Sequence, residues 1–258
     1  MLQLPKHVMD DLAGLVLVAA LVFLGCACRS TRINDPNENT KTTQPTPDPT
    51  RKTVCIDPGH PSEVNSGATV QNGTTEVHVA WMVALKLRQL LEAEGLNVVM
   101  TKSREDELVK NRERAEIANR SGAALMVRLH CDASADEGFA LYAPDQQATR
   151  DGVTGPPQAV IGASRLLAQT IDTEMAKRLS GVLKDGGVRG DSVTAVGSKQ
   201  GALTGSIFSR IPVVTIEMVV LSNRADAEFI KSEAGEQRMA QAIADGIKAF
   251  VAHPSSSP

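Results

Sequence analysis

The chain of 258 residues is poor in aromatic side chains, because five Phe, one Trp and one Tyr make up only 3% of it. So few rings leave little with which to stack bases or sugars. An excess of positive charge is also missing, since 27 Lys and Arg face 30 Asp and Glu for a net charge of −3. Nucleic-acid binding proteins usually carry a basic excess or patch. We therefore expect no nucleic-acid partner.

Cysteine is scarce as well, and the four that are present exclude a disulfide-dense miniprotein. Cys26 and Cys28 belong to an apolar run near the N-terminus. Cys55 and Cys131 lie within apolar, strand-like runs, where an unpaired buried thiol is expected rather than a disulfide.

One long hydrophobic run is present, LAGLVLVAALVFLGCAC at positions 12–28. It falls between the core of a signal peptide and a membrane span, which needs about 20 apolar residues. Its end, Leu24-Gly25-Cys26, resembles the bacterial lipoprotein signal, in which Cys26 would be lipidated. An uncleaved anchor helix is the alternative. In both cases we expect segment 1–28 to export the chain and tether it to a membrane, facing the periplasm or the cell wall.

Three further segments follow from composition. Positions 29–51 are polar and rich in Thr and Pro, with no apolar periodicity, which predicts an extended linker. Positions 52–252 have enough apolar residues for one folded domain. Positions 253–258, HPSSSP, predict a flexible tail.

Within 52–252, short β-branched runs alternate with segments of helical periodicity. We expect strands at 53–57, 97–101, 123–130, 138–143 and 212–217, and helices at 75–94, 105–120, 164–184 and 234–252. The 21-residue stretch 143–163 is expected to be a loop. This pattern predicts a single α/β domain, whose mostly parallel, mixed-edge sheet is flanked by helices on both faces.

Polar residues follow three of these strands where ligands bind in such folds, beyond the carboxyl ends of the strands. His60 follows an Asp-Pro-Gly turn, His130 ends a strand, and Glu217 ends another. Glu76 opens the helix that returns towards this edge. Hydrolytic zinc sites take three His or carboxylate ligands and leave a fourth position for water. His60, Glu76 and His130 are thus candidate ligands, and Glu217 is a candidate acid or base.

Each of these residues also has a structural interpretation. A His at a strand end is often a hydrogen-bonded structural residue, and the helix dipole favours a Glu in a first helical turn without any metal. His78 is not a candidate, because it lies two residues after Glu76 and therefore about 200° further round the helix.

The motifs occur in an order that resembles a known family. They are Val54-Cys-Ile-Asp-Pro-Gly-His60, Glu76, Arg104, Arg114-Ala-Glu-Ile-Ala-Asn119, Leu129-His130, and Val214-Thr-Ile-Glu217 followed by Leu221-Ser-Asn223. From about Thr53 to Phe250 the chain resembles the zinc-dependent N-acetylmuramoyl-L-alanine amidases of the amidase-3 type.

The resemblance implies a catalytic domain at 52–252 that cleaves the amide between N-acetylmuramoyl groups and the L-alanine of peptidoglycan stem peptides. It implies that His60, Glu76 and His130 bind Zn²⁺ and that Glu217 is catalytic. Asp57 is then expected to fix the loop that carries His60. Some members shelter their zinc with a long inserted helix, but the stretch between Gly190 and Glu217 is too short for one, so an open site is expected.

The chain departs from the family pattern at several places. Pro61-Ser62 replaces Gly-Gly, and Val219-Val220 replaces Gly-Phe. Arg128 would repel the metal or bind a substrate carboxylate, and Cys131 could compete as a soft ligand. Two alternatives therefore stay open: a zinc carboxypeptidase or endopeptidase of the wall, and a non-catalytic peptidoglycan-binding protein with a degenerate site.

Overall fold

The computed structural model describes residues 48 and 50–252. The expectations for segment 1–28 with its Cys26, for most of the linker 29–51 and for the tail 253–258 lie outside these residues. Across the described part of the chain, no helix has the length and apolar character that crossing a bilayer requires.

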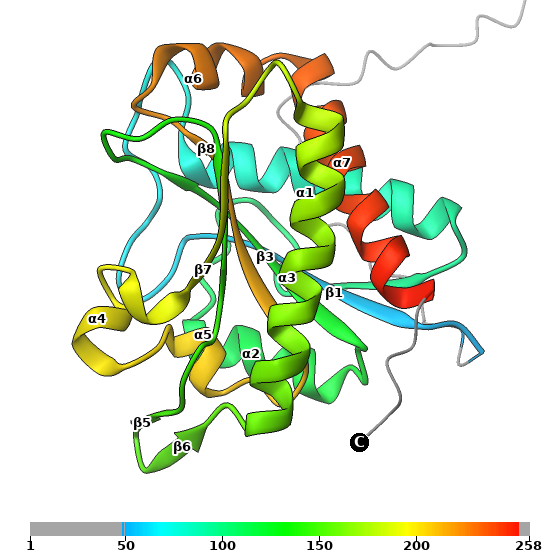
Figure 1. Ribbon diagram of the computed structural model, residues 1–258, viewed down its shortest axis with the longest axis vertical. Helices are drawn as coiled ribbons and strands as arrows, with labels where there is room; N and C mark the ends of the chain where they lie inside the picture. The colour runs from blue at the N-terminus through cyan, green and yellow to red at the C-terminus, as the bar shows by residue number, and fades with distance from the viewer. Residues whose placement is uncertain (1–47, 49, 253–258) are drawn as a thin grey trace, which may run out of the picture. The chain divides into compact units, whose positions relative to one another are not determined.

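The described part forms one six-stranded sheet and a small separate hairpin (Figure 1). The strands are β1 (Thr53–Pro58), β2 (Asn97–Met100), β3 (Leu125–Asp132), β4 (Phe139–Ala143), β5 (Ala148–Arg150), β6 (Val153–Gly155), β7 (Asp185–Gly190) and β8 (Val213–Val220). The helices are α1 (Glu76–Ala93), α2 (Asn111–Arg120), α3 (Gln158–Leu179), α4 (Gly197–Gln200), α5 (Thr204–Ile207), α6 (Arg224–Ile230) and α7 (Glu233–Ala252), with a 3-10 turn, η1, at Asp191–Val193.

The strand order in the sheet is β2-β1-β3-β8-β4-β7. β2, β1, β3 and β8 are parallel, whereas β4 pairs antiparallel with β8 and parallel with β7. The edge formed by β4 and β7 therefore runs opposite to the rest of the sheet. This confirms the predicted single α/β domain with a mostly parallel sheet and a mixed edge.

The two faces of the sheet differ. Successive residues of a strand point to opposite faces. Along β1, β3 and β8 one set of side chains, including Ile56, Leu129 and Ile216, lies in the main core with residues of α1, α3 and α7. We call this the covered face. The alternate set begins with Cys55, Met126 and Val213, which pack with Ala118 of α2. Helices thus lie on both faces, as predicted.

Further along the same strands, the face under α2 becomes polar. There the alternate positions carry Asp57 on β1, Arg128 and His130 on β3, and Glu217 on β8. We call this the site face. The strand alternation thus places functional side chains directly on the backbone that the main core holds.

Two predicted helices have different bounds in the structure. The helix expected at 105–120 begins only at Asn111. Before it, the side chain of Glu107 accepts the N–H of Ser103 (2.6 Å) and the N–H of Val109 donates to the carbonyl of Pro61 (3.2 Å). The first contact closes a local turn and the second ties the segment to the loop that carries His60, so neither belongs to a helical ladder.

The helix expected at 164–184 spans Gln158–Leu179 instead, so the stretch 143–163 is not one loop. It contains the hairpin β5–β6 and the first turn of α3. Gly181, with φ of 74°, lies just after α3, and the glycine-rich segment that follows forms strand β7. A segment with two adjacent glycines does not predict a strand, and it becomes one by pairing with β4.

Cys55 and Cys131 are both free and buried, as expected. They belong to different clusters, Cys55 on the α2 side and Cys131 in the main core.

Candidate metal centre

The three predicted ligands come from three different elements. His60 lies in the loop after β1, His130 on β3, and Glu76 is the first residue of α1. α1 begins at this point because the Thr75 hydroxyl accepts the N–H of His78 (3.3 Å) as an N-cap. The close approach of the β1 loop to β3 needs glycine, since a Cβ at Gly59 would lie 2.7 Å from Cε1 of His130.

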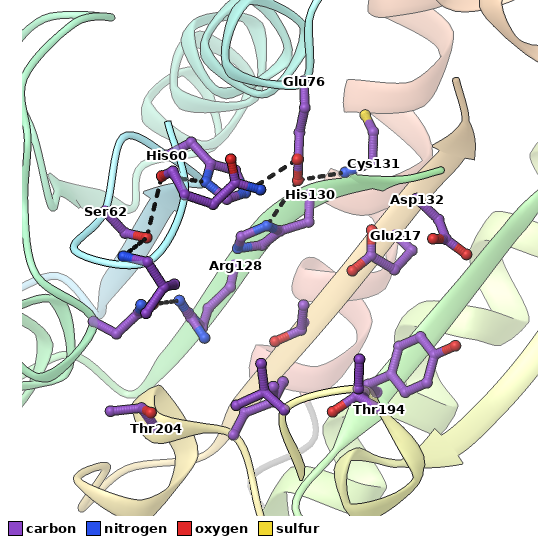
Figure 2. Close-up of a pocket in the computed structure, with 18 of the residues that line it drawn as sticks. His60, Ser62, Glu76, Arg128, His130, Cys131, Asp132, Thr194, Thr204 and Glu217 are labelled. Carbon is purple, nitrogen blue, oxygen red and sulfur yellow. Dashed lines mark hydrogen bonds and ion pairs between the residues drawn. The ribbon is translucent and has the colours of Figure 1, made fainter. Parts of the chain in front are cut away.

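These elements bring the three side chains together (Figure 2). Glu76 bridges both rings, with Oε2 at 3.1 Å from Nε2 of His60 and Oε1 at 3.0 Å from Nδ1 of His130. The two rings stand edge to face with centroids 5.0 Å apart. One ligand atom from each residue lies within 4.8 Å of the others, so the group could hold a metal ion.

The surroundings of the group fit a metal. Nδ1 of His60 lies 3.0 Å from the carbonyl of Asn65, which orients the ring and leaves Nε2 directed at the group. Nε2 of His130 and Oε2 of Glu217 are buried without a hydrogen-bond partner. Such atoms are rare and costly unless a ligand completes the site. Two imidazoles and one carboxylate are also the donor set of an open catalytic zinc site.

The protonation states suit metal binding too. Burial would raise the pKa of Glu76, but hydrogen bonds from His130 and His60 lower it to about 2, so the carboxylate is ionised. Burial lowers the pKa of His130, which keeps its imidazole neutral. An ionised carboxylate and a neutral imidazole are the forms that ligate metals.

Glu217 lies beside this group. It is in register with His130 on the neighbouring strand, and both line one cavity of about 660 Å³. Burial, followed by the nearby carboxylates of Glu76 and Asp132, raises the pKa of Glu217 well above its usual value. These surroundings favour the protonated form of the carboxyl group, as is common for carboxyl groups that act as general acids or bases.

Asp57 is fully buried below the group and makes two ion pairs. Its carboxylate contacts Nη1 of Arg114 at 2.6 Å and Nε of Arg128 at 2.8 Å. Burial would raise its pKa, but the two arginines hold it below the usual range. The expectation that Asp57 acts on the His60 loop corresponds to this contact with Arg114, which also binds the loop.

The loop of His60 is held by two buried cations. Arg114 donates to the carbonyls of Pro58 and Pro61, each at 2.7 Å. Lys102 donates to the carbonyls of His60 and, at 3.4 Å, of Gly59. Every carbonyl from 58 to 61 therefore has a cationic donor, which stabilises a loop in which His60 has a φ of 54°.

The roles of Lys102 and Arg114 were not predicted from the sequence. Arg114 belongs to a motif quoted for the family, but it was given no role there. Its position contains a usable signal: it precedes Ala118 by four residues and so lies on the apolar stripe of α2, where a charged residue needs a buried partner.

Two further residues named in the sequence analysis, His78 and Arg128, lie in different surroundings. His78 lies outside the group, half exposed, with Nδ1 at 3.2 Å from Glu105. Arg128 lines the cavity but is only 3% exposed, with Nη2 at 2.7 Å from Asn111. Its charge is thus partly neutralised by Asp57.

The departures from the family pattern have modest local effects. Cys131 lines the cavity, but burial raises the pKa of its thiol well above the usual value, which disfavours the thiolate that a metal would bind. Val219 and Val220 are buried and do not line the cavity. Between Gly190 and β8, the described helices have three or four residues each, in keeping with the expected absence of a sheltering helix.

Comparisons with known proteins agree with this site. The family model described as Amidase_3, N-acetylmuramoyl-L-alanine amidase, matches residues 54–249. N-acetylmuramoyl-L-alanine amidase AmiA of Escherichia coli (strain K12) is 24% identical over 232 residues, which cover 78% of this chain and 76% of that protein. The uncharacterized protein YqiI of Bacillus subtilis (strain 168) is 29% identical over 202 residues, 77% of this chain and 84% of that protein.

Among solved structures, N-acetylmuramoyl-L-alanine amidase AmiC2 of Nostoc punctiforme superposes with a TM-score of 0.63 at 23% identity, covering 78% of this chain and 98% of that one. At this identity the likeness concerns the fold. The family model, in contrast, spans nearly the whole described domain, including all three residues of the metal group and Glu217. The chain therefore belongs to the amidase-3 family of N-acetylmuramoyl-L-alanine amidases.

Proposed function

We propose that this chain is a zinc-dependent hydrolase that cleaves the amide between N-acetylmuramoyl groups and the L-alanine of peptidoglycan stem peptides. The observation that carries the proposal is the convergence of His60, Glu76 and His130, next to Glu217, in a chain of the amidase-3 family. A binding protein with a degenerate site would not need this complete set.

His60, Glu76 and His130 would hold the zinc ion. Bound there, zinc would polarise the scissile carbonyl and lower the pKa of a water molecule towards 7. The buried carbonyl contacts of the His60 loop keep one ligand in place, and the hydrogen bond of His60 to Asn65 sets which ring nitrogen faces the group.

Glu217 would move the proton. It faces the same cavity as the metal group and stands opposite His130 across the two strands. A carboxylate in this position can accept a proton from water and then donate it to the nitrogen of the leaving L-alanine. Asp132 lines the same end of the cavity, and its charge favours the protonated form of Glu217.

We further propose that the domain works outside the cytoplasm while attached to a membrane, with peptidoglycan as its partner. The apolar run 12–28 that ends at Cys26, followed by the polar stretch 29–51, supports this proposal. A Cys26→Ser variant should lose radiolabelled fatty acid and move from the membrane to the soluble fraction. Unchanged membrane retention would favour an uncleaved anchor helix instead.

The central experiment is digestion of purified peptidoglycan with and without a chelator, followed by mass spectrometry of the fragments. We expect intact stem peptides with a free L-alanine amine, and about one zinc per chain by metal analysis. Shortened stem peptides would point to the carboxypeptidase or endopeptidase alternative. Glu217→Gln should abolish release while zinc stays bound, and full activity of this variant would contradict the role of Glu217.

A further inference from the structure

The cavity beside the metal group has two ends of different charge. Arg128, His130 and Asp132 follow one another along β3, and all three line the cavity. The metal group therefore lies between an end with Asp132 and Glu217 and an end with Arg128. Figure 2 shows Arg128 and Thr204 on one side of the cavity and Asp132 on the other.

A second arginine reaches the cationic end from another element. Arg150, on β5, also lines the cavity, and its Nη1 donates to Oε1 of Gln200 and, at 3.1 Å, to Oγ1 of Thr204. The next residue, Gly205, lies against Arg128: a Cβ there would be only 2.7 Å from Nη1 of Arg128. Two consecutive residues of α5 thus each touch one guanidinium group.

The two arginines at this end have few carboxylates in direct contact. Arg128 shares the single carboxylate of Asp57 with Arg114. Among the described residues, no carboxylate lies within 4.0 Å of Arg150, which donates instead to the neutral oxygens of Gln200 and Thr204. The carboxylate of Glu63 interacts electrostatically with Arg150 from beyond that distance, accepts hydrogen bonds from Asn111 and does not line the cavity. Asp191, whose charge also acts on Arg128, is fully buried and does not line the cavity. A guanidinium fixed by neutral acceptors keeps donors available for an anion.

Arg150 is also held in position by packing. Ala148, two residues earlier on β5, belongs to a small buried cluster with Ile207, the last residue of α5, and Phe208, its C-cap. The hairpin and α5 therefore form one packed unit at the edge of the cavity. Because this packing already orders Arg150, binding of a ligand costs less side-chain conformational entropy.

We propose that Arg150, beside Arg128, forms a subsite for a free carboxylate of the stem peptide; this rests on the proposed amidase function. The residue after L-alanine is a D-glutamate joined through its side chain, so its α-carboxylate is free. One residue of extended chain spans about 3.5 Å, which puts this carboxylate roughly 6 Å from the scissile nitrogen. The Cα atoms of Arg128 and His130 are about 6.6 Å apart along the strand.

The subsite gives the substrate a direction. The stem peptide lies towards Arg150 and the hairpin, and the glycan lies towards the end with Asp132. In many walls the same α-carboxyl group is amidated, which removes its charge. The subsite therefore predicts that this enzyme distinguishes the acid from the amide at the second peptide position.

The test uses two muramoyl dipeptides that differ only in this group, N-acetylmuramoyl-L-alanyl-D-glutamic acid and its α-amide, N-acetylmuramoyl-L-alanyl-D-isoglutamine. With the full zinc-loaded enzyme we expect kcat/KM about tenfold higher for the acid, mainly through KM, because one charge-assisted hydrogen-bonded pair is lost with the amide. Arg150→Met should remove this preference by slowing cleavage of the acid alone. Arg150→Lys should keep part of it.

Two further variants separate the subsite from a general loss of structure. Gly205→Ala keeps every charge but displaces Arg128, and it should reduce the preference for the acid. Arg165→Met removes an exposed arginine of α3 that does not line the cavity, and it should leave both substrates unaffected.

The possible failures are distinguishable. Equal cleavage of acid and amide by the wild-type enzyme, unchanged in Arg150→Met, would overturn the subsite and leave the amidase function intact. If the enzyme cleaves neither the two dipeptides nor peptidoglycan, the proposed amidase function is overturned. In that case calorimetric binding of the two dipeptides to Glu217→Gln decides the subsite: tighter binding of the acid, lost on Arg150→Met, supports it, and equal binding overturns it.

Discussion

The two faces of the sheet are built on the same strands but are stabilised differently. On the covered face, Ile56, Leu129 and Ile216 pack under α1, α3 and α7, and burial of apolar surface dominates. On the site face, the alternate positions of the same strands carry Asp57 and Arg128, which form a buried ion pair, and Glu217, whose surroundings favour the protonated carboxyl group. Because adjacent residues of a strand point to opposite faces, apolar packing on the covered face fixes the backbone that carries each functional side chain on the site face.

The two faces also differ in how sensitive the stability of the fold is to the loss of a single side chain. Apolar packing tolerates the loss of a few contacts, whereas a buried charge without its partner is expensive. On the site face, buried cations take the place of apolar packing and satisfy the carbonyls of an irregular loop. Three predictions test this difference, in decreasing order of expected effect.

The largest effect is expected for Arg114→Met on the site face. This change leaves Asp57 with one ion pair, to Arg128, beside its hydrogen bond from Thr101, and removes the donor to the carbonyls of Pro58 and Pro61. The free energy of unfolding should fall by about 3–5 kcal/mol, as for other broken buried pairs. Zinc affinity, measured by chelator competition, should fall with it, because the loop of His60 loses its support.

Arg112→Met is the matched control for this prediction. Arg112 is two residues earlier on the same helix, but it is half exposed and pairs with Glu116. Its loss should cost about 0.5 kcal/mol or less in unfolding free energy. Equal stability and equal zinc affinity in Arg114→Met and the wild type would show that the loop does not depend on buried cations.

A smaller and qualitatively different effect is expected for Leu129→Ala on the covered face. Leu129 lies between Arg128 and His130 on β3, yet its side chain is fully buried in the main core. Loss of contacts and a residual cavity should cost about 2–4 kcal/mol. At temperatures where the variant is folded, its zinc affinity should stay within about twofold of the wild type. A parallel drop in zinc affinity would mean that the two faces are not independent.

The smallest effect is a gain in stability from Asp172→Asn. Asp172 of α3 is partly buried near Asp185, and burial followed by this charge raises its pKa from 3.8 to about 6. A carboxyl group with a raised pKa in the folded state destabilises the fold once it ionises. The variant should therefore match the wild type below pH 4, gain stability between pH 4 and 6, and keep the gain above pH 6.

The size of this gain is about 1 kcal/mol, because solvent screens a half-buried group. Urea denaturation at pH 4 and pH 7.5 measures it. A variant less stable than the wild type at pH 7.5 would contradict the unfavourable charge of Asp172.

Much of the fold followed from local patterns. The periodicity of Val77, Ala84 and Leu91 predicted α1 to within a residue at each end, since an amphipathic helix needs only its own sequence to define its buried stripe. The strands β1, β3 and β8 were predicted from short apolar runs, whose signal is likewise contained in a few neighbouring residues. β7 was missed because its glycines favour no strand, and only pairing with β4 makes it one.

In the candidate site, too, some residues could be predicted from local sequence and others could not. The residues His60, Glu76, His130 and Glu217 could be selected from the sequence, because each stands at a strand end or helix start and polar groups at these positions meet at one edge of an α/β sheet. The family resemblance added their expected roles. Of the supporting cations, only Arg114 carried a signal in the sequence, its place on the apolar stripe of α2. The partners of Lys102 and Arg150 could not be selected, because they are set by how the loop of His60 and α5 pack against them.

The sequence by itself determined the alternation of strands and helices, the choice of polar residues at the strand ends, and the family to which the chain belongs. Only the tertiary structure decided which charges neutralise each other and which are left over. Local propensity acts over a few residues, whereas the ion pairs of Asp57 span 57 and 71 positions, and Arg150 reaches Thr204 across 54. Such contacts depend on how the elements pack, and packing is a property of the whole folded domain.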